Sequence, residues 1–131
     1  MNLLLDTHVA LWWLAGSPSL KRKLREQIAS SACAVSVASI WEVAIKHRLG
    51  KLSVSPQVFR DEMRNAGAAI LPISDAHAVA FARLPAGHGD PFDLLLLATA
   101  KEERMRFVTA DQALQRYADG IDGLVVEAHG E

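Results

Sequence analysis

The sequence predicts an α/β sandwich, in which a central parallel sheet of about five short strands is covered by helices on both faces. Short apolar runs alternate along the chain with segments that are typical of helices, which is the order expected of βαβ units. The expected strands are apolar at consecutive positions, so both of their faces should be buried, as in parallel sheets. With 131 residues, half of them hydrophobic, the chain should fold as a single domain, residues 1–131.

Each element follows from local signals, because glycine, proline and serine residues separate the apolar runs. Ser19 can cap the second helix, the spacing of Ser39 and Glu42 fits a capping box, and Asp90-Pro91 starts the most apolar helix. The strands are expected at residues 3–5, 32–36, 69–73, 107–109 and 124–126. The helices are expected at residues 9–15, 20–29, 39–49, 55–67, 74–83, 90–105 and 111–117, with a loop at residues 85–89.

Composition and charge exclude several classes of protein. Lys and Arg number 14 and Asp and Glu 15, so the protein does not hold nucleic acid by gross positive charge. The longest apolar stretches are far shorter than the ~20 residues of a membrane helix, and the N-terminus lacks the basic region of a signal peptide. Cys33 is the lone cysteine, cannot form an internal disulfide and is expected to be a small buried side chain. We therefore expect a cytoplasmic protein without a membrane segment.

Four acidic residues are expected near the carboxyl ends of strands. Asp6 follows the first strand, and Asp111 follows the strand that ends at Thr109. Glu42 and Asp93 are expected in the first turns of the helices that begin near residues 39 and 90. Right-handed crossovers bring such strand ends to one edge of the sheet, where α/β proteins bind ligands. Taken singly, each acid could instead be a helix cap or a turn residue.

Four carboxylates at one edge, without basic neighbours in the sequence, would repel one another unless a cation lay between them. Oxygen-only ligands suit Mg²⁺ or Mn²⁺, and such sites activate water for attack on a phosphodiester. We therefore expect Asp6, Glu42, Asp93 and Asp111 to be both the metal ligands and the catalytic residues. With these four acids held around a metal, 14 positive charges face 11 negative ones, and the remaining surface is mildly basic.

An ordered set of motifs runs through nearly the whole chain. Its members are LLDTH (4–8), LWWL (11–14), SIWEVAIK (39–46), GKL (50–52), LPI (71–73), HA (77–78), LP (84–85), His88, DPFD (90–93) and TAD (109–111). With these motifs the sequence resembles the PIN-domain ribonucleases, and most closely the VapC-type toxins of bacterial toxin–antitoxin pairs. The acids Asp6, Glu42, Asp93 and Asp111 fall on that family's acidic metal-binding positions.

The resemblance implies a PIN-like α/β/α sandwich and a Mg²⁺- or Mn²⁺-dependent endoribonuclease that leaves 5′-phosphate and 3′-hydroxyl ends. It also implies the toxin of a type II toxin–antitoxin system, with a small antitoxin as partner, RNA as substrate and a homodimeric assembly. Close relatives often carry Arg directly after the Asp93 position, whereas this chain has Leu94. No basic substrate contact is therefore expected from that position.

Further residues near the expected site have a functional and a structural interpretation. Asp90 should cap its helix and could also contact the metal. Thr7 and Thr109 could hydrogen-bond the acids or shape ordinary turns. His8 and His88 could act as acid or base or could serve orientation and packing, and Trp12, Trp13 and Trp41 could stack nucleobases or pack in the core or an interface. Lys46, Arg48 and Lys51 could form a phosphate-steering rim or simply a solvated helix end.

The apolar stretches 9–14 and 40–45 are expected to supply a homodimer contact and an antitoxin groove near the cleft, without a decision on which stretch does which.

Two other classes of function stay open at this point. A phosphatase could use an acid after the first strand, although its haloacid-type form needs a second Asp where His8 stands. An inactive PIN-like binding module would keep the fold without the chemistry. The presence of all four acids favours the nuclease.

Overall fold

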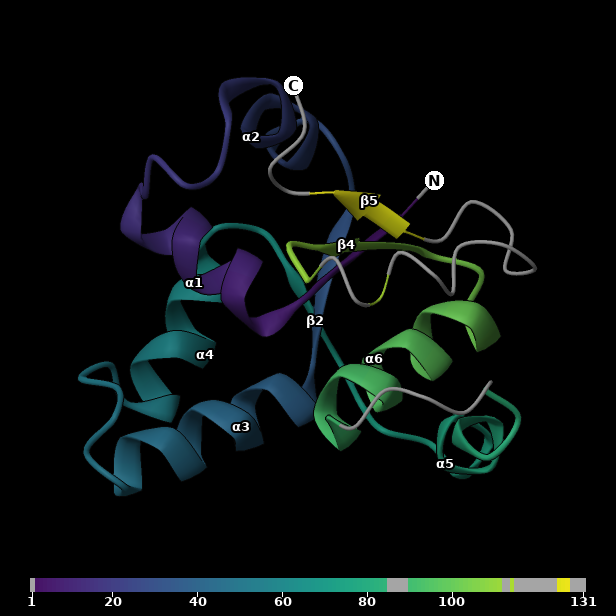
Figure 1. The fold of residues 1–131 in the computed structure, drawn as a ribbon. Coiled ribbons are helices and arrows are strands. Elements are labelled where there is room, and N and C mark those ends of the chain that lie inside the picture. The colour runs from purple at the N-terminus through teal and green to yellow at the C-terminus, as the bar shows by residue number, and fades with distance from the viewer. Residues whose placement is uncertain (1, 85–89, 112–113, 115–124, 128–131) are drawn as a thin grey trace.

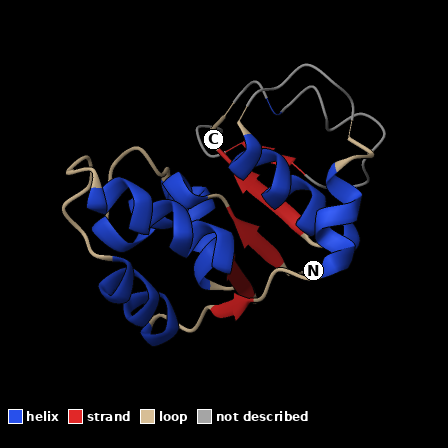
Figure 2. Cartoon of the chain, turned by 90° about the horizontal axis from the view of Figure 1, so that it is seen from below, coloured by secondary structure: helices blue, strands red, loops and turns tan. Residues whose placement is uncertain are grey.

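The computed structural model contains a five-stranded parallel sheet between two groups of helices (Figures 1 and 2). It describes residues 2–84, 90–111, 114 and 125–127. Within these ranges no helix combines the length and the apolar character that a membrane span requires. The expected α/β sandwich with about five short parallel strands is confirmed.

The elements lie close to their expected positions, and their bounds are as follows. The strands are β1 (Leu3–Leu5), β2 (Cys33–Ser36), β3 (Ala69–Leu71), β4 (Arg106–Thr109) and β5 (Val125–Glu127). The helices are α1 (Thr7–Ala15), α2 (Arg22–Ala29), α3 (Val37–Arg48), α4 (Pro56–Asn65), α5 (Asp75–Phe81) and α6 (Pro91–Glu102). The predicted helix at residues 111–117 and the predicted loop at 85–89 lie largely or wholly outside the described residues.

The order of the strands creates a crevice at the site of interest. The sheet runs β3-β2-β1-β4-β5, so the chain first moves outward from β1 and then returns to its other side. At such a reversal the loops after the two central strands diverge and leave room for a ligand at the carboxyl ends. Asp6 directly follows β1, and Asp111 follows β4 after one intervening residue.

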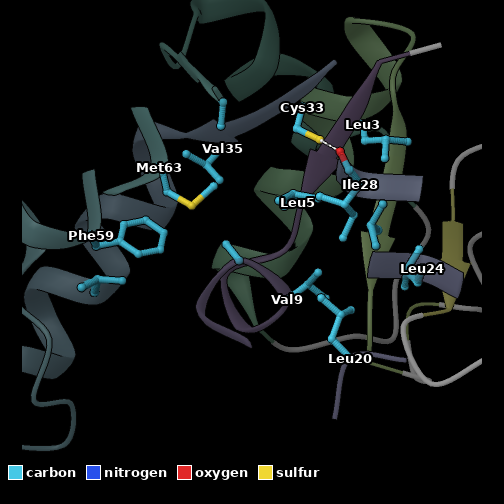
Figure 3. Close-up of a cluster of buried hydrophobic side chains, with 14 residues drawn as sticks. Leu3, Leu5, Val9, Leu20, Leu24, Ile28, Cys33, Val35, Phe59 and Met63 are labelled. Atoms are coloured by element: carbon cyan, nitrogen blue, oxygen red, sulfur yellow. Dashed lines mark hydrogen bonds between the residues drawn. The ribbon is translucent and has the colours of Figure 1, made fainter. Parts of the chain in front are cut away.

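Strand residues alternate between two hydrophobic layers. Leu3 and Leu5 pack with buried residues of α1, α2 and α4, whereas Leu4 and Phe107 pack with buried residues of α6. Figure 3 shows the first of these layers. Its labelled members are Leu3, Leu5, Val9, Leu20, Leu24, Ile28, Cys33, Val35, Phe59 and Met63. The site therefore stands on a sheet that is buried on both faces.

Two predicted helix starts are wrong. The predicted capping box of Ser39 and Glu42 does not form, because Ser36 caps α3 by accepting a hydrogen bond from the Ala38 N–H at 2.9 Å. The helix therefore begins at Val37, which moves Glu42 from the expected first turn into the second. Ser36 at the end of β2 lies within reach of the free N–H groups at the start of α3, so Ser36 rather than Ser39 caps the helix.

The second helix also starts later than predicted. It begins at Arg22, and its N-cap Lys21 makes no side-chain cap, so the predicted cap by Ser19 is wrong. The Arg25 Nη2 donates to the carbonyl oxygens of Ser17 and Leu20 at 2.6 and 3.0 Å. These bonds join the helix to the segment that precedes it.

Candidate active site at the carboxyl ends of β1 and β4

Asp6 is fixed at the centre of the site by three hydrogen bonds. Its backbone N–H donates to the Val108 carbonyl oxygen of β4 at 2.9 Å. Its Oδ1 caps α1 by accepting from the His8 N–H at 2.9 Å, and its Oδ2 accepts from Thr109 Oγ1 at 2.5 Å. The residue is only 2% exposed. The structure confirms the capping interpretation, and the same side chain lines the cavity described below.

Thr109 connects two of the predicted acids. Its hydroxyl donates to Asp6 and accepts from the Asp111 N–H at 3.1 Å, so the prediction that it bonds the acids is confirmed. Thr7 does something else, because its hydroxyl donates to Ser39 Oγ at 2.8 Å in a buried contact. That bond joins the start of α1 to α3 and fixes the helix that carries Glu42.

The start of α6 brings two more acids to the same place. Asp90 is the N-cap, as predicted, because its Oδ1 accepts from the Phe92 N–H at 2.9 Å, and Pro91 follows it. Asp93 then lies in the first turn of the helix. The two acids face a cavity of about 350 Å³, and its lining consists of Asp6, His8, Trp12, Asp90, Asp93, Ala110 and Asp111.

The electrostatics of this cavity are dominated by Asp93. Burial raises the pKa of its carboxyl group to about 8, and the neighbouring carboxylates of Asp6, Asp90, Asp111 and Glu42 contribute to the rise. Each of these groups disfavours a further negative charge at this point. A cation in the cavity would reverse that effect and favour the ionised form.

Glu42 stands apart from the other three predicted acids. It is 5% exposed and is not part of the cavity lining, although its negative charge contributes to the raised pKa of Asp93. Its Oε2 accepts from Lys46 Nζ at 3.0 Å. Its Oε1 is buried and has no hydrogen-bond partner among the described residues. The structure therefore brings three of the four predicted acids to one surface and places the fourth beside it.

Of the predicted histidines, only His8 is seen at the site. Its Nδ1 lies 3.7 Å from Asp6 Oδ1, and the interaction with the Asp6 carboxylate raises the pKa of His8. His88 lies outside the described residues.

The three tryptophans have different surroundings. Trp12 and Trp13 both pack against the first hydrophobic layer, and Trp12 also lines the cavity. Trp41 is 59% exposed, and its ring meets the edge of Phe92 with centroids 5.4 Å apart. Beside this pair runs an apolar groove of about 400 Å³, lined by Trp41, Ile45, Ala78, Phe81, Pro91, Phe92 and Leu95. Leu94 packs against the second hydrophobic layer and presents no charge to either hollow.

The donor set fits a divalent metal better than any other ligand class. Within the part of the chain that is described, no group of three or more His, Cys, Asp or Glu side chains has the arrangement of a formed metal site. The cavity nevertheless collects carboxylate oxygens, and the unbonded Oε1 of Glu42 is a further buried acceptor close to them. Hard cations such as Mg²⁺ and Mn²⁺ take such oxygen ligands.

Comparisons with known proteins agree on one family. The PIN-domain family model matches residues 3–120. Ribonuclease VapC22 of Mycobacterium tuberculosis (strain ATCC 25618 / H37Rv) is 33% identical over 124 residues, which cover 88% of this chain and 92% of the relative.

Solved structures show a similar fold. A toxin-antitoxin complex from Klebsiella pneumoniae contains a chain with a TM-score of 0.67 and 23% identity, covering 98% of this chain and 99% of that one. The structure of VapBC2 from Rickettsia felis bound to a DNA fragment from their promoter gives a TM-score of 0.67 at 19% identity, covering 97% of this chain and 98% of that one.

Proposed function

Because the chain belongs to the PIN-domain family, we propose that it is a divalent-metal-dependent endoribonuclease that acts as the toxin of a type II toxin–antitoxin pair. The named relative, a ribonuclease, supports the activity. Chains of similar fold in toxin–antitoxin complexes support the biological role. The cytoplasm, where RNA and a reducing environment coincide, is the proposed location.

The convergence of acids on the cavity at the carboxyl ends of β1 and β4 carries this proposal. Asp93 lines the cavity together with Asp6 and Asp111, which come from other elements, and the charges of both contribute to the raised pKa of Asp93. Such an arrangement places several negative charges close together, which is unfavourable for a merely structural site. It is suited to a cation-binding site.

In this proposal Asp6, Asp93 and Asp111 hold Mg²⁺ or Mn²⁺ together with Glu42. Bound metal would supply Lewis-acid activation of water and stabilisation of the leaving oxygen of an RNA phosphodiester. Asp6 needs little reorganisation for this role, because Thr109 and the His8 N–H already fix its carboxylate. Asp90 chiefly caps α6 and adds negative charge to the cavity.

The antitoxin is proposed to cover the cavity and the apolar groove together. Both hollows take lining residues from the start of α6, because Pro91 and Phe92 line the groove and Asp93 lines the cavity. A partner segment with apolar side chains for the groove and a cation for the acids would match both surfaces. Apolar surface also remains at Val37 and Val79, which agrees with the proposed homodimer.

The test of the proposed activity is cleavage of RNA by the purified protein. We expect cleavage with Mn²⁺ or Mg²⁺, loss of cleavage in EDTA, and recovery when metal is added back. Hydrolysis of p-nitrophenyl phosphate without RNA cleavage would instead favour a phosphatase. RNA binding without cleavage of any substrate would favour an inactive binding module.

The proposed partner is tested by expression. The protein alone should be toxic and poorly soluble or dimeric, whereas co-expression with the neighbouring small reading frame should yield a stable, inactive complex. A well-behaved monomer that is harmless and co-purifies with nothing would contradict the toxin role.

A further inference from the structure

Lys46 forms a hydrogen bond with one of the two carboxylate oxygens of Glu42. It lies one helical turn after Glu42 on α3, and its Nζ donates to Glu42 Oε2 at 3.0 Å. The order Glu then Lys at this spacing is the favourable one on a helix. The Lys46 side chain is 36% exposed, whereas the Glu42 side chain is 6% exposed. A partly exposed cation is thus bonded to a buried carboxylate.

The two carboxylate oxygens of Glu42 differ in their hydrogen bonding. Oε2 is occupied by Lys46, and Oε1 is buried without a hydrogen-bond partner among the described residues. A buried acceptor without a partner is costly, and buried charges are normally paired or bound to a metal. The bond from Lys46 therefore fixes which oxygen is left for an additional ligand.

The position of α3 is itself fixed from the other side of the site. Thr7 follows Asp6 and donates to Ser39, one turn before Glu42. With its helix anchored at Ser39 and its carboxylate anchored at Lys46, Glu42 has little freedom to turn.

The geometry points to Lys46 as a positioning residue, which orients Glu42 so that Oε1 meets the metal ion. This inference rests on the proposed metal-dependent function. Among the described residues, Lys46 is the one lysine or arginine within ion-pair distance of any of the four acids. Partners that hold a metal ligand in place commonly affect metal affinity by ~10- to 100-fold.

The affinity of the RNA-free protein for Mn²⁺, measured by isothermal titration calorimetry, separates this role from a simple charge effect. If Lys46 were only a nearby positive charge, its removal would reduce repulsion of the cation and tighten Mn²⁺ binding. If Lys46 positions Glu42, Lys46→Met should weaken Mn²⁺ binding about tenfold or more. The two interpretations therefore predict opposite signs.

Three further variants complete the experiment. Lys46→Arg keeps the charge and the hydrogen bond and should restore most of the affinity. Arg48→Met removes one positive charge from the exposed end of the same helix and should not weaken binding. In a Glu42→Gln background, Lys46→Met should have little further effect, because it acts through Glu42.

The outcomes distinguish this inference from the proposed function. If the wild-type protein binds Mn²⁺ and Lys46→Met binds it equally well or more tightly, the positioning role is wrong and the metal site stands. If the wild-type protein binds no Mn²⁺, both fail. Thermal melts check that each variant is folded, and Lys46→Gln, for which the same weakening is expected, replaces Lys46→Met if that variant does not fold.

Discussion

The acidic side chains at the two ends of the sheet have different neighbours. At the amino ends of the strands, a hollow of about 220 Å³ contains Glu103, whose Oε2 lies 2.7 Å from Nε2 of the buried His77. The Nδ1 of His77 accepts from the Ser74 N–H at 3.1 Å, so Nε2 carries the proton that it donates to Glu103. The acid at this end has a built-in donor.

At the carboxyl ends, the larger hollow is lined by Asp6, Asp90, Asp93 and Asp111 and by no lysine or arginine among the described residues. The same parallel strands support both ends, so the fold alone does not explain the difference. An end whose acids are each matched by a partner is stable by itself. The acids at the carboxyl ends instead lie close to one another, as expected of the proposed cation site.

The largest expected effect is at Asp93. Asp93→Asn keeps the shape but removes the charge, and RNA cleavage should fall at least about a hundredfold, since several kcal/mol of charge stabilisation are lost. Asp90→Asn is the matched control on the same turn, because Asn caps a helix as well as Asp does, and it should be milder. Cleavage rates of the two variants at saturating Mn²⁺ make the comparison. Equal losses would mean that Asp90 is also a metal ligand.

A smaller effect is expected from the hydroxyl that joins Asp6 to Asp111. Thr109→Val leaves a buried Asp6 oxygen and the Asp111 N–H without this partner, which should cost about 1–3 kcal/mol of stability and reduce Mn²⁺ affinity. Thr99→Val is the control, because the buried Thr99 hydroxyl bonds the Leu95 carbonyl oxygen within α6 and none of the acids among the described residues. It should change the free energy of unfolding without changing Mn²⁺ affinity. Weaker binding in both variants would show that general loosening is responsible.

The pH dependence of the metal-free protein should be more modest. The pKa of Asp93 is about 8 in the folded protein and 3.8 when unperturbed, so the folded state holds this proton more tightly. The contribution of Asp93 to stability is complete below about pH 4 and is lost as the pH rises through about 8. Melting temperatures in EDTA should therefore fall more steeply toward pH 8 in the wild type than in Asp93→Asn. Parallel curves for the two proteins would contradict the raised pKa.

The smallest effect is expected at the amino end. Cys33 is buried, its thiol donates to the Ile28 carbonyl oxygen at 3.2 Å, and burial raises its pKa (Figure 3). Cys33→Ala should cost about 1 kcal/mol of stability and leave Mn²⁺ affinity and cleavage unchanged. A change in either functional quantity would mean that the two ends of the sheet are coupled.

The sequence allowed the centre of the site to be predicted because strand ends are simple to recognise. Apolar runs followed directly by Asp6 or closely by Asp111 are enough, given that parallel strands end at one edge. Asp90 and Pro91 likewise carry their own helix-start signal, and the structure confirms the cap. The placement of Asp93 in the first turn of that helix follows from it.

Other features depended on tertiary context and could not be predicted. Ser36 and Ser39 are both acceptable caps, and only the end of β2 decides between them, so the turn occupied by Glu42 was misjudged. The buried His77 appeared in the sequence only as part of a family motif, because its partner Glu103 is 26 residues away. The spacing of four residues between Glu42 and Lys46 can be read from the sequence, but the burial of Glu42 cannot.

The position of a bound cation tests the distinction between the two ends most directly. Crystals soaked in Mn²⁺ and measured at the manganese absorption edge would show it as an anomalous difference peak. We predict a peak at the carboxyl ends of β1 and β4, within coordination distance of carboxylate oxygens of Asp6, Asp93 and Asp111. The absence of any peak there at saturating Mn²⁺, or a peak only beside Glu103 at the amino ends, would contradict the assignment.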